Sequence, residues 1–380
     1  MRSAPYGLVA ALIFVRFADE WATFLPAGSL EPMRRDLGLT YAQVAAILVA
    51  LPAGGFLGSF FLVAADYVSR RLLASLGALA YGLAMIAFGC SHTLTGLLVA
   101  SFVWGAASDA FIHGCEVALV DLAEDQLPKA LARMHGWAAV GDLLGPLTVA
   151  AAAMLGLSWR AGFIGLGLLM FGYAAWVAGQ RFPPPKPPQH APSPLAGILA
   201  IARDRRVLML ALVLGLFSLL DEPLAGFMIA YLERVRRLSP ALAAMPVMAI
   251  LIGGMAGYAG YERLLGLRPA RTAVVACAGL MAAALPAALF APCLALQVPA
   301  AFAFGLAASV FYTTLDAIVL GLRPGQVGAT SAVVSTVGMI GIGFPALVGL
   351  AADAWGLGPA IGLYALIPVL VLALVAADRK

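Results

Sequence analysis

Charged residues are scarce in this sequence. Asp, Glu, Lys and Arg make up 11% of its 380 residues, whereas soluble domains carry roughly 25%. Hydrophobic residues reach 63% and follow one another in long stretches with short polar joints between them. This pattern excludes a water-soluble enzyme, and lipid is the expected solvent for most of the surface.

Cysteines and catalytic motifs are also few. The four cysteines lie within or at the ends of apolar stretches, without the paired spacing of a disulfide framework or a metal site. The sequence has no nucleophile elbow, phosphate-binding loop or histidine-rich metal motif. We therefore expect neither an enzyme nor a metal or other cofactor. The net charge of +4 comes from Lys and Arg in the joints between apolar stretches, so nucleic acid is not an expected partner.

What the sequence does have is apolar stretches of the length that crosses a bilayer, about 20 residues. The first follows Met1-Arg2-Ser3 without a small-residue cleavage site, so we expect a membrane span rather than a signal peptide. The pattern predicts an all-α membrane protein with twelve spans, at 6–27, 43–65, 72–91, 94–118, 135–156, 160–180, 207–231, 240–261, 271–291, 295–320, 329–352 and 358–376.

The longest polar interruption, 181–206, combines a proline run with Arg203, Arg205 and Arg206. It predicts an extended linker between two six-helix bundles at 1–180 and 207–380. Of the 23 Lys and Arg, Arg16 lies within span 1 and 16 fall in the joints on the side of the termini and linker. The other joints hold the remaining six, which are Arg34, Arg35, Arg160, Arg234, Arg236 and Arg237. This bias predicts cytoplasmic termini and a cytoplasmic linker.

The two predicted bundles repeat one another. Span 1 and its exit loop contain Asp19-Glu20, Leu30-Glu31 and Arg34-Arg35, and the same pairs recur 202 residues later as Asp221-Glu222, Leu232-Glu233 and Arg236-Arg237. At an offset of 200, the residues Gly105, Phe111, Gln126, Gly141 and Gly156 recur as Gly305, Phe311, Gln326, Gly341 and Gly356, and Glu116 corresponds to Asp316. The halves are therefore expected to be parallel copies.

Two parallel six-helix repeats joined by a cytoplasmic linker resemble the major facilitator superfamily. At the motif level, Asp66 with Arg70 and Arg71 is similar to the charge cluster that the superfamily carries after span 2. In span 5, Gly141 and Gly145-Pro146 have a spacing associated with its exporters. The resemblance implies that these six residues take part in gating. It also implies a small-molecule substrate bound between the halves of a monomer in membrane lipid.

Placing an ionisable side chain within the membrane costs free energy. Each such residue is therefore expected to have a charged or polar partner, contact with water, or a functional role. In span 1, Arg16 is three and four residues from Asp19 and Glu20, so one ion pair is expected. That pair is either structural or part of a substrate or proton site. Span 7 has Ser218 in place of the arginine, so Asp221 or Glu222 is expected to be protonated or paired elsewhere. Both Pro223 and the glycine run at 338–345 are expected to bend their helices.

Span 4 carries a polar stripe. Asp109, His113 and Glu116 follow one another at steps of four and three, on one helical face. They are candidates for a proton relay or for a structural network with Asp142 of span 5, while a divalent metal would find them an incomplete ligand set. Asp316 is the repeat mate of Glu116.

These observations favour a secondary active transporter that works by alternating access with protons as coupling ion, in the inner membrane of a bacterium. The expected substrate or proton site comprises Arg16, Asp19, Glu20, Asp109, His113, Glu116, Asp142, Asp221, Glu222 and Asp316, with the aromatic residues Trp21, Trp104, Phe217 and Tyr312. Its excess of carboxylates favours protons, cations or neutral solutes over anions. An uncoupled facilitator or lipid flippase of the same fold is the alternative, and a membrane-embedded enzyme or scaffold fits less well.

Overall fold

A computed structural model describes residues 6–56, 68–123, 127–182, 201, 203–265, 269–322 and 327–377. Its long elements are all helices within these ranges. In the first half they are α1 (Tyr6–Thr23), α2 (Leu25–Leu37), α3 (Tyr41–Gly55), α5 (Arg70–Cys90), α6 (Leu94–Ala123), α7 (Leu127–Met154) and α8 (Arg160–Ala178). In the second half they are α10 (Arg205–Phe217), α11 (Glu222–Arg234), α12 (Pro240–Leu265), α13 (Ala270–Phe290), α14 (Leu294–Gly321), α15 (Val327–Gly338), α16 (Phe344–Trp355) and α17 (Leu357–Ala377).

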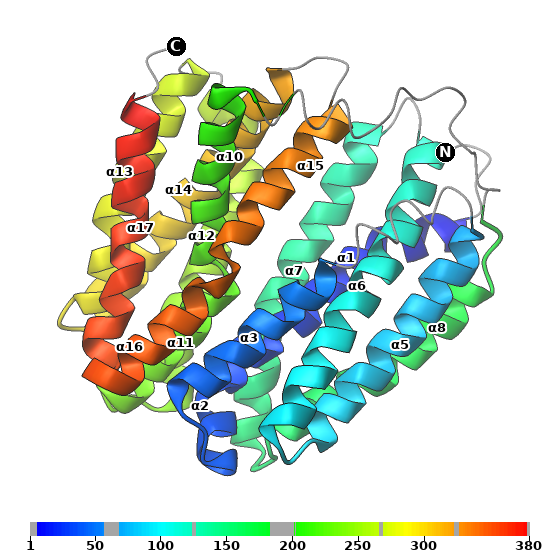
Figure 1. Cartoon of the computed structure of the whole chain (residues 1–380), viewed down its shortest axis with the longest axis horizontal. Helices are drawn as coiled ribbons and strands as arrows, with labels where there is room; N and C mark the ends of the chain where they lie inside the picture. The colour runs from blue at the N-terminus through cyan, green and yellow to red at the C-terminus, as the bar shows by residue number, and fades with distance from the viewer. Residues whose placement is uncertain are drawn as a thin grey trace. The chain divides into compact units, whose positions relative to one another are not determined.

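Helix contacts divide the chain into two units, Met1–Gln189 and His190–Lys380, with the boundary inside the predicted linker. In the N-terminal unit, α6 packs against α3 and α5, α5 packs against α8, and α1 packs against α7 (Figure 1). In the C-terminal unit, α14 packs against α12 and α13, α13 against α17, and α10 against α15. Each pair of the first unit thus has a counterpart in the second, which is the arrangement that parallel copies predict.

The glycines that repeat between the halves have matching packing roles. A Cβ on Gly105 of α6 would overlap the carbonyl oxygen of Leu51 in α3, and a Cβ on Gly305 of α14 would overlap that of Ile250 in α12. Only glycine permits these two close helix approaches. The repeat in the sequence is therefore a repeat in geometry.

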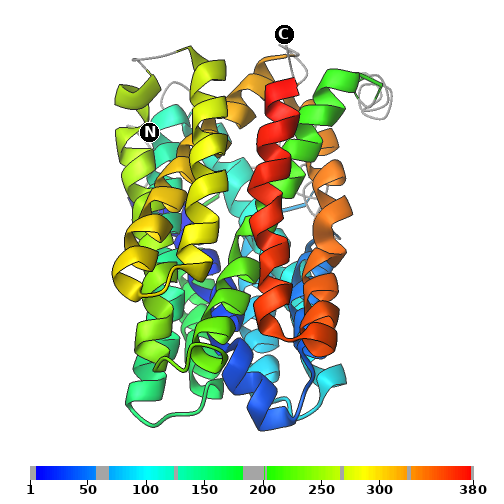
Figure 2. The ribbon, with the colours of Figure 1, turned by 90° about the vertical axis from the view of Figure 1, so that its left-hand side faces the viewer.

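Turns repeat as well. Gly156 and Gly356 both have positive φ values, of 69° and 87°, which favour glycine over residues with a side chain. Gly356 ends α16 and lets α17 (red) turn back beside it (Figure 2).

Ten helices in the described ranges are long and apolar enough to cross a membrane. The two remaining spans correspond to α1, which carries Arg16, Asp19 and Glu20, and to α3, of which only Tyr41–Gly55 is described. The prediction of an all-α membrane protein is confirmed, and twelve spans are consistent with this structure.

Two of the predicted spans each contain a 3-10 turn between two α-helices. Between α10 and α11 lies a 3-10 turn, η2 (Ser218–Leu220), and between α15 and α16 lies another, η3 (Met339–Gly343). The first break ends three residues before Pro223 and the second falls in the glycine run, so the bends expected at both places are confirmed. Proline lacks the amide hydrogen that a continuous helix needs, and glycine adds backbone freedom.

Candidate functional site

An ion-pair network joins α1 to α6 in the N-terminal unit. Arg16 donates from Nε to Glu116 Oε1 at 2.9 Å, and its Nη2 lies 2.8 Å from the same oxygen. Its Nη1 lies 3.8 Å from Glu20 Oε1, one helical turn away. His113 adds its Nδ1 at 3.7 Å from the other oxygen of Glu116. The guanidinium therefore lies between two carboxylates from different helices.

Asp19 belongs to a second, more deeply buried contact between the same helices. Its side chain is buried and accepts a hydrogen bond from the hydroxyl of Ser108 in α6 at 2.5 Å. The hydroxyl of Tyr81 in α5 donates to the backbone oxygen of Asp19 at 3.3 Å. Asp19 thus anchors α1 to two neighbours, and the ion pair of Arg16 forms with Glu116 and Glu20.

The three residues of the span 4 stripe have different contacts. Glu116 and His113 face the Arg16 network, whereas Asp109 is half-buried beside α3, where a Cβ on Gly55 would lie 3.5 Å from its Oδ2. Asp142 is half-buried on α7, next to the glycine that contacts α1. Glu116 thus pairs with Arg16 of α1, while the proton relay and the structural network with Asp142 both stay predictions.

The corresponding region of the C-terminal unit has different chemistry. Asp221 is exposed and occupies the junction between η2 and α11, followed by Glu222 at the first position of α11. Ser218, which replaces Arg16 in the repeat, donates its hydroxyl to the backbone oxygen of Gly215 at 2.8 Å. The sequence contains no Lys, Arg or His from Val207 to Glu233, so span 7 offers these carboxylates no cation of its own.

Aromatic stacking takes the place of the α1–α6 ion pair. Phe217 at the end of α10 stacks on Phe311 and Tyr312 of α14, with ring centroids 5.6 and 5.5 Å apart. Asp316, the repeat mate of Glu116, is half-buried further along α14. The contact between α1 and α6 thus includes an ion pair, whereas the related contact between α10 and α14 includes stacked aromatic rings.

The two expected tryptophans have different surroundings. Trp21 donates from Nε1 to Thr148 Oγ1 at 2.8 Å and so ties α1 to α7. Trp104 is fully buried within the N-terminal unit, where it packs against Tyr81, Phe88 and Phe163. In this structure Trp104 packs inside a bundle.

The predicted gating residues of span 5 contact α1 within their own bundle. A Cβ on Gly141 would lie 2.5 Å from the backbone oxygen of Phe17, and one on Gly145 would overlap the side chain of Phe24. Pro146 is buried beside them. Among the charge-cluster residues, Arg70 is buried at the start of α5 and Arg71 is exposed, while Asp66 lies outside the described residues. The gating role stays a prediction.

Sequence reasoning missed three polar contributors, namely Ser108, Tyr81 and Thr148. Ser108 precedes Glu116 by two steps of four residues, a spacing that places both on the α1-facing side of α6. That signal was available in the sequence. Tyr81 and Thr148 had none, because each is distant in sequence from the residue that it contacts.

Comparison with known families gives a match over most of the chain. The family model described as Major Facilitator Superfamily matches residues 9–346. No curated protein sequence matches the chain.

Solved structures resemble the whole chain in fold. A bacterial homolog of the human lysosomal transporter Spinster, in an inward-facing and unoccupied conformation, has a TM-score of 0.78 at 15% identity, covering 98% of this chain and 97% of that one. The nucleoside transporter NupG has a TM-score of 0.79 at 11% identity, covering 98% of this chain and 99% of that one. At such identities the likeness concerns the fold alone.

Proposed function

The chain belongs to the major facilitator superfamily, and from this premise we propose that it is a secondary active transporter that moves a small solute by alternating access with protons as coupling ion. Membership in the family makes it a membrane transporter and not an enzyme. The coupling ion, the small-solute substrate, the monomeric state and a bacterial inner membrane with cytoplasmic termini are the proposed parts.

The observation that carries the proposal is the charge asymmetry between spans 1 and 7. In span 1 Arg16 forms ion pairs with two carboxylates, at 2.8 and 3.8 Å. In span 7 the acidic pair is kept, the arginine is replaced by Ser218, and Asp221 is exposed at a helix break. A carboxylate at membrane depth without a cation in its own span is costly unless it takes up a proton or binds a positive ligand.

A carboxyl group in this position can couple protonation to conformation. When its surroundings are dry, the neutral form is favoured, and when water reaches it, the ionised form is favoured. A transporter whose two access states differ in this hydration binds a proton more tightly in one of them, and that difference in affinity is the coupling. The helix break at η2 places Asp221 where the backbone itself can change.

The test requires a substrate, which a thermal-shift screen of purified protein can find because a bound ligand stabilises the folded state. In proteoliposomes, Asp221→Asn, Glu222→Gln and the double variant are expected to lose accumulation driven by a pH gradient. They should keep substrate exchange, since the amides resemble the protonated acids in shape. Asp353→Asn, an exposed carboxylate near the end of α16, is the control and should behave as wild type.

Wild-type accumulation by the double variant would place the coupling group elsewhere. The stripe of Asp109, His113 and Glu116 would then be the next candidate. Glu116→Gln alone would be uninformative there, because Glu116 also holds Arg16.

A further inference from the structure

One arginine ties three helices of the N-terminal unit together. Arg160 lies at the start of α8 and donates from Nη1 to the backbone oxygens of Gly89, at 3.0 Å, and of Ser91, at the end of α5. Its Nη2 lies 2.8 Å from Oδ2 of Asp36, near the end of α2. The indole Nε1 of Trp159 donates to the same carboxylate oxygen at 3.2 Å. We call this arrangement the N-terminal clamp.

A second arginine makes a similar contact in the C-terminal unit. Arg236 follows α11 in the chain and donates from Nη2 to the backbone oxygens of Ala291, at 3.3 Å, and of Pro292, at the end of α13. Ala291 is the repeat mate of Ser91, at an offset of 200. The guanidinium of Arg236 therefore has the position on α13 that Arg160 has on α5. We call this contact the C-terminal clamp.

The two clamps are related in position and not in sequence. The repeat mate of Arg236 is Arg34, which pairs with Glu31 within α2 at 3.0 Å. The contact with α5 comes from Arg160, whose repeat mate is Ala360. Different arginines thus reach the same carbonyl position in both halves. A guanidinium there satisfies carbonyl oxygens that have no partner inside their own helix, and it faces the negative end of the helix dipole.

Each clamp holds a half-helix that follows a break. The helix of span 1 is interrupted at Phe24, after which α2 begins with Pro26 in its first turn. In span 7, α11 begins after η2 and has Pro223 in its first turn. Because proline lacks an amide hydrogen, the backbone hydrogen bonding that joins each half-helix to the preceding helix is weakened.

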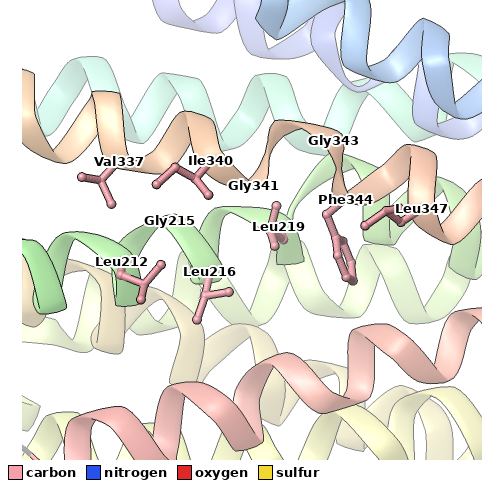
Figure 3. A pocket seen from close by; sticks show the side chains of 10 residues that line it. All are labelled: Leu212, Gly215, Leu216, Leu219, Val337, Ile340, Gly341, Gly343, Phe344 and Leu347. Carbon is pink, nitrogen blue, oxygen red and sulfur yellow. The ribbon is translucent and has the colours of Figure 1, made fainter.

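The break before α11 lies beside a second break. Residues of η2 and η3 line one apolar pocket, in which Figure 3 shows Leu219 of η2 directed toward Gly341 of η3. A Cβ on Gly341 would lie 2.8 Å from Cδ2 of Leu219, so glycine allows this close approach. A Cβ on Gly343, which also lines the pocket, would meet no atom within 4 Å. The backbone that leads into α11 therefore borders a second interrupted segment and unfilled room.

We propose that α2 and α11 are hinged segments and that the two clamps are latches, which tie α2 to α5 and α8, and α11 to α13. Release of a latch lets its segment turn at the break and exposes a buried face, since eight of the 13 residues of α2 and nine of the 13 of α11 are buried. This motion inside a unit goes beyond rigid-body rocking of two units. Its use in a transport cycle rests on the proposed function.

The reactivity of a buried cysteine measures release of the N-terminal clamp. In a variant without the four native cysteines, Ser29→Cys places a thiol at a buried position of α2, and Ser101→Cys places one at a buried position of α6. Both proteins, in lipid nanodiscs, are treated with a charged, water-soluble thiol reagent. Asp36→Ala removes the carboxylate and leaves Arg160 on α5. It should raise the reaction rate at Ser29→Cys by at least about tenfold, and leave the rate at Ser101→Cys unchanged.

The matched control removes an ion pair inside α2. Arg35 is half exposed and pairs with Glu31 at 2.7 Å, so Arg35→Ala leaves the clamp intact and should react like the parent protein. Arg160→Gln should act like Asp36→Ala at Ser29→Cys. If Arg160→Gln fails to fold, Asp36→Ala carries the test, because the side chain of Asp36 is 46% exposed.

The C-terminal clamp is tested in the same way. Arg236→Gln should raise the reaction rate at Ala230→Cys of α11 and leave that at Ala301→Cys of α14 unchanged. Both alanines are fully buried, and Ala301 is the repeat mate of Ser101. Arg237→Gln changes the exposed neighbour of Arg236 and is the control.

Three results would overturn the proposal. One is an unchanged rate at Ser29→Cys in both clamp variants. Another is an equal rise at Ser101→Cys, which would mean that the whole unit is loosened. The third is the same rise with Arg35→Ala. The measurement needs neither a substrate nor a pH gradient, so the latches can fail while proton coupling holds, and can be supported where proton coupling fails.

Discussion

Arg16 is the residue on which the charges of the N-terminal unit depend. It bridges Glu20 in its own helix and Glu116 in α6, with 28% of its side chain exposed. Removing one member of a buried ion pair leaves a charge without compensation, which costs more than the pair contributes. The partial exposure places the cost below that of a fully buried pair.

We therefore expect Arg16→Gln to lower the free energy of unfolding by about 2 kcal/mol. The double variant Arg16→Gln/Glu116→Gln should recover part of that loss, because it also removes the negative charge of Glu116 that the single variant leaves without Arg16. Thermal unfolding in detergent measures both, with Arg181→Gln, an exposed arginine, as control. Strictly additive losses in the double variant would contradict an interaction between the two side chains.

At this scale the sequence was informative about residue types and less so about partners. The cost of charge at membrane depth singled out Arg16, Asp19 and Glu20 without any structure. The pairing of Arg16 with Glu116, 100 residues away, depends on how α1 packs against α6. Periodicity along one helix does not contain that information, and the stronger partner therefore had to come from the structure.

At the scale of elements, close helix contacts depend on individual glycines. Gly141 of α7 lies against the backbone of α1, whereas Gly136, five residues earlier in the same helix, has no atom within 4 Å of a built Cβ. The two positions thus form an internal comparison.

Gly141→Ala should destabilise the protein by about 1–3 kcal/mol, because the methyl group forces α1 and α7 apart. Gly136→Ala should be neutral or stabilising, since alanine favours the helix by up to about 1 kcal/mol over glycine. Chemical or thermal unfolding of both variants gives the comparison. Equal stability of the two would mean that α1 and α7 are not in contact at Gly141.

The helix breaks show what a sequence signal can and cannot specify. Pro223 and the glycines at 338–345 predicted where spans 7 and 11 bend. They did not predict that both bends would form the walls of one pocket, because the pairing of α10 with α15 is a tertiary contact. The location of the breaks was local information and their juxtaposition was not.

For the whole molecule, orientation in the membrane follows from the distribution of Lys and Arg. In a variant without the four native cysteines, Pro187→Cys should react with a membrane-impermeant thiol reagent only when the cytoplasmic side is accessible. Ser158→Cys, in the loop after α7, should show the opposite accessibility. Labelling of Pro187→Cys from the outside of intact cells would invert the topology.

Hydropathy and the repeat were sufficient to predict the fold and the family, since both are properties of the whole chain and tolerate errors at single positions. The family model over residues 9–346 confirms that prediction. Substrate identity was beyond the sequence because it depends on a few side chains from separate helices.

Under the proposed function, this transporter uses a proton gradient to concentrate its substrate. The direct measurement is substrate uptake into proteoliposomes with an imposed pH gradient and without one, membrane potential being clamped in both. Proton coupling predicts accumulation above the equilibrium level only with the gradient, and its loss when a protonophore is added. Equilibration to the same level in both conditions would contradict coupling and identify an uncoupled facilitator.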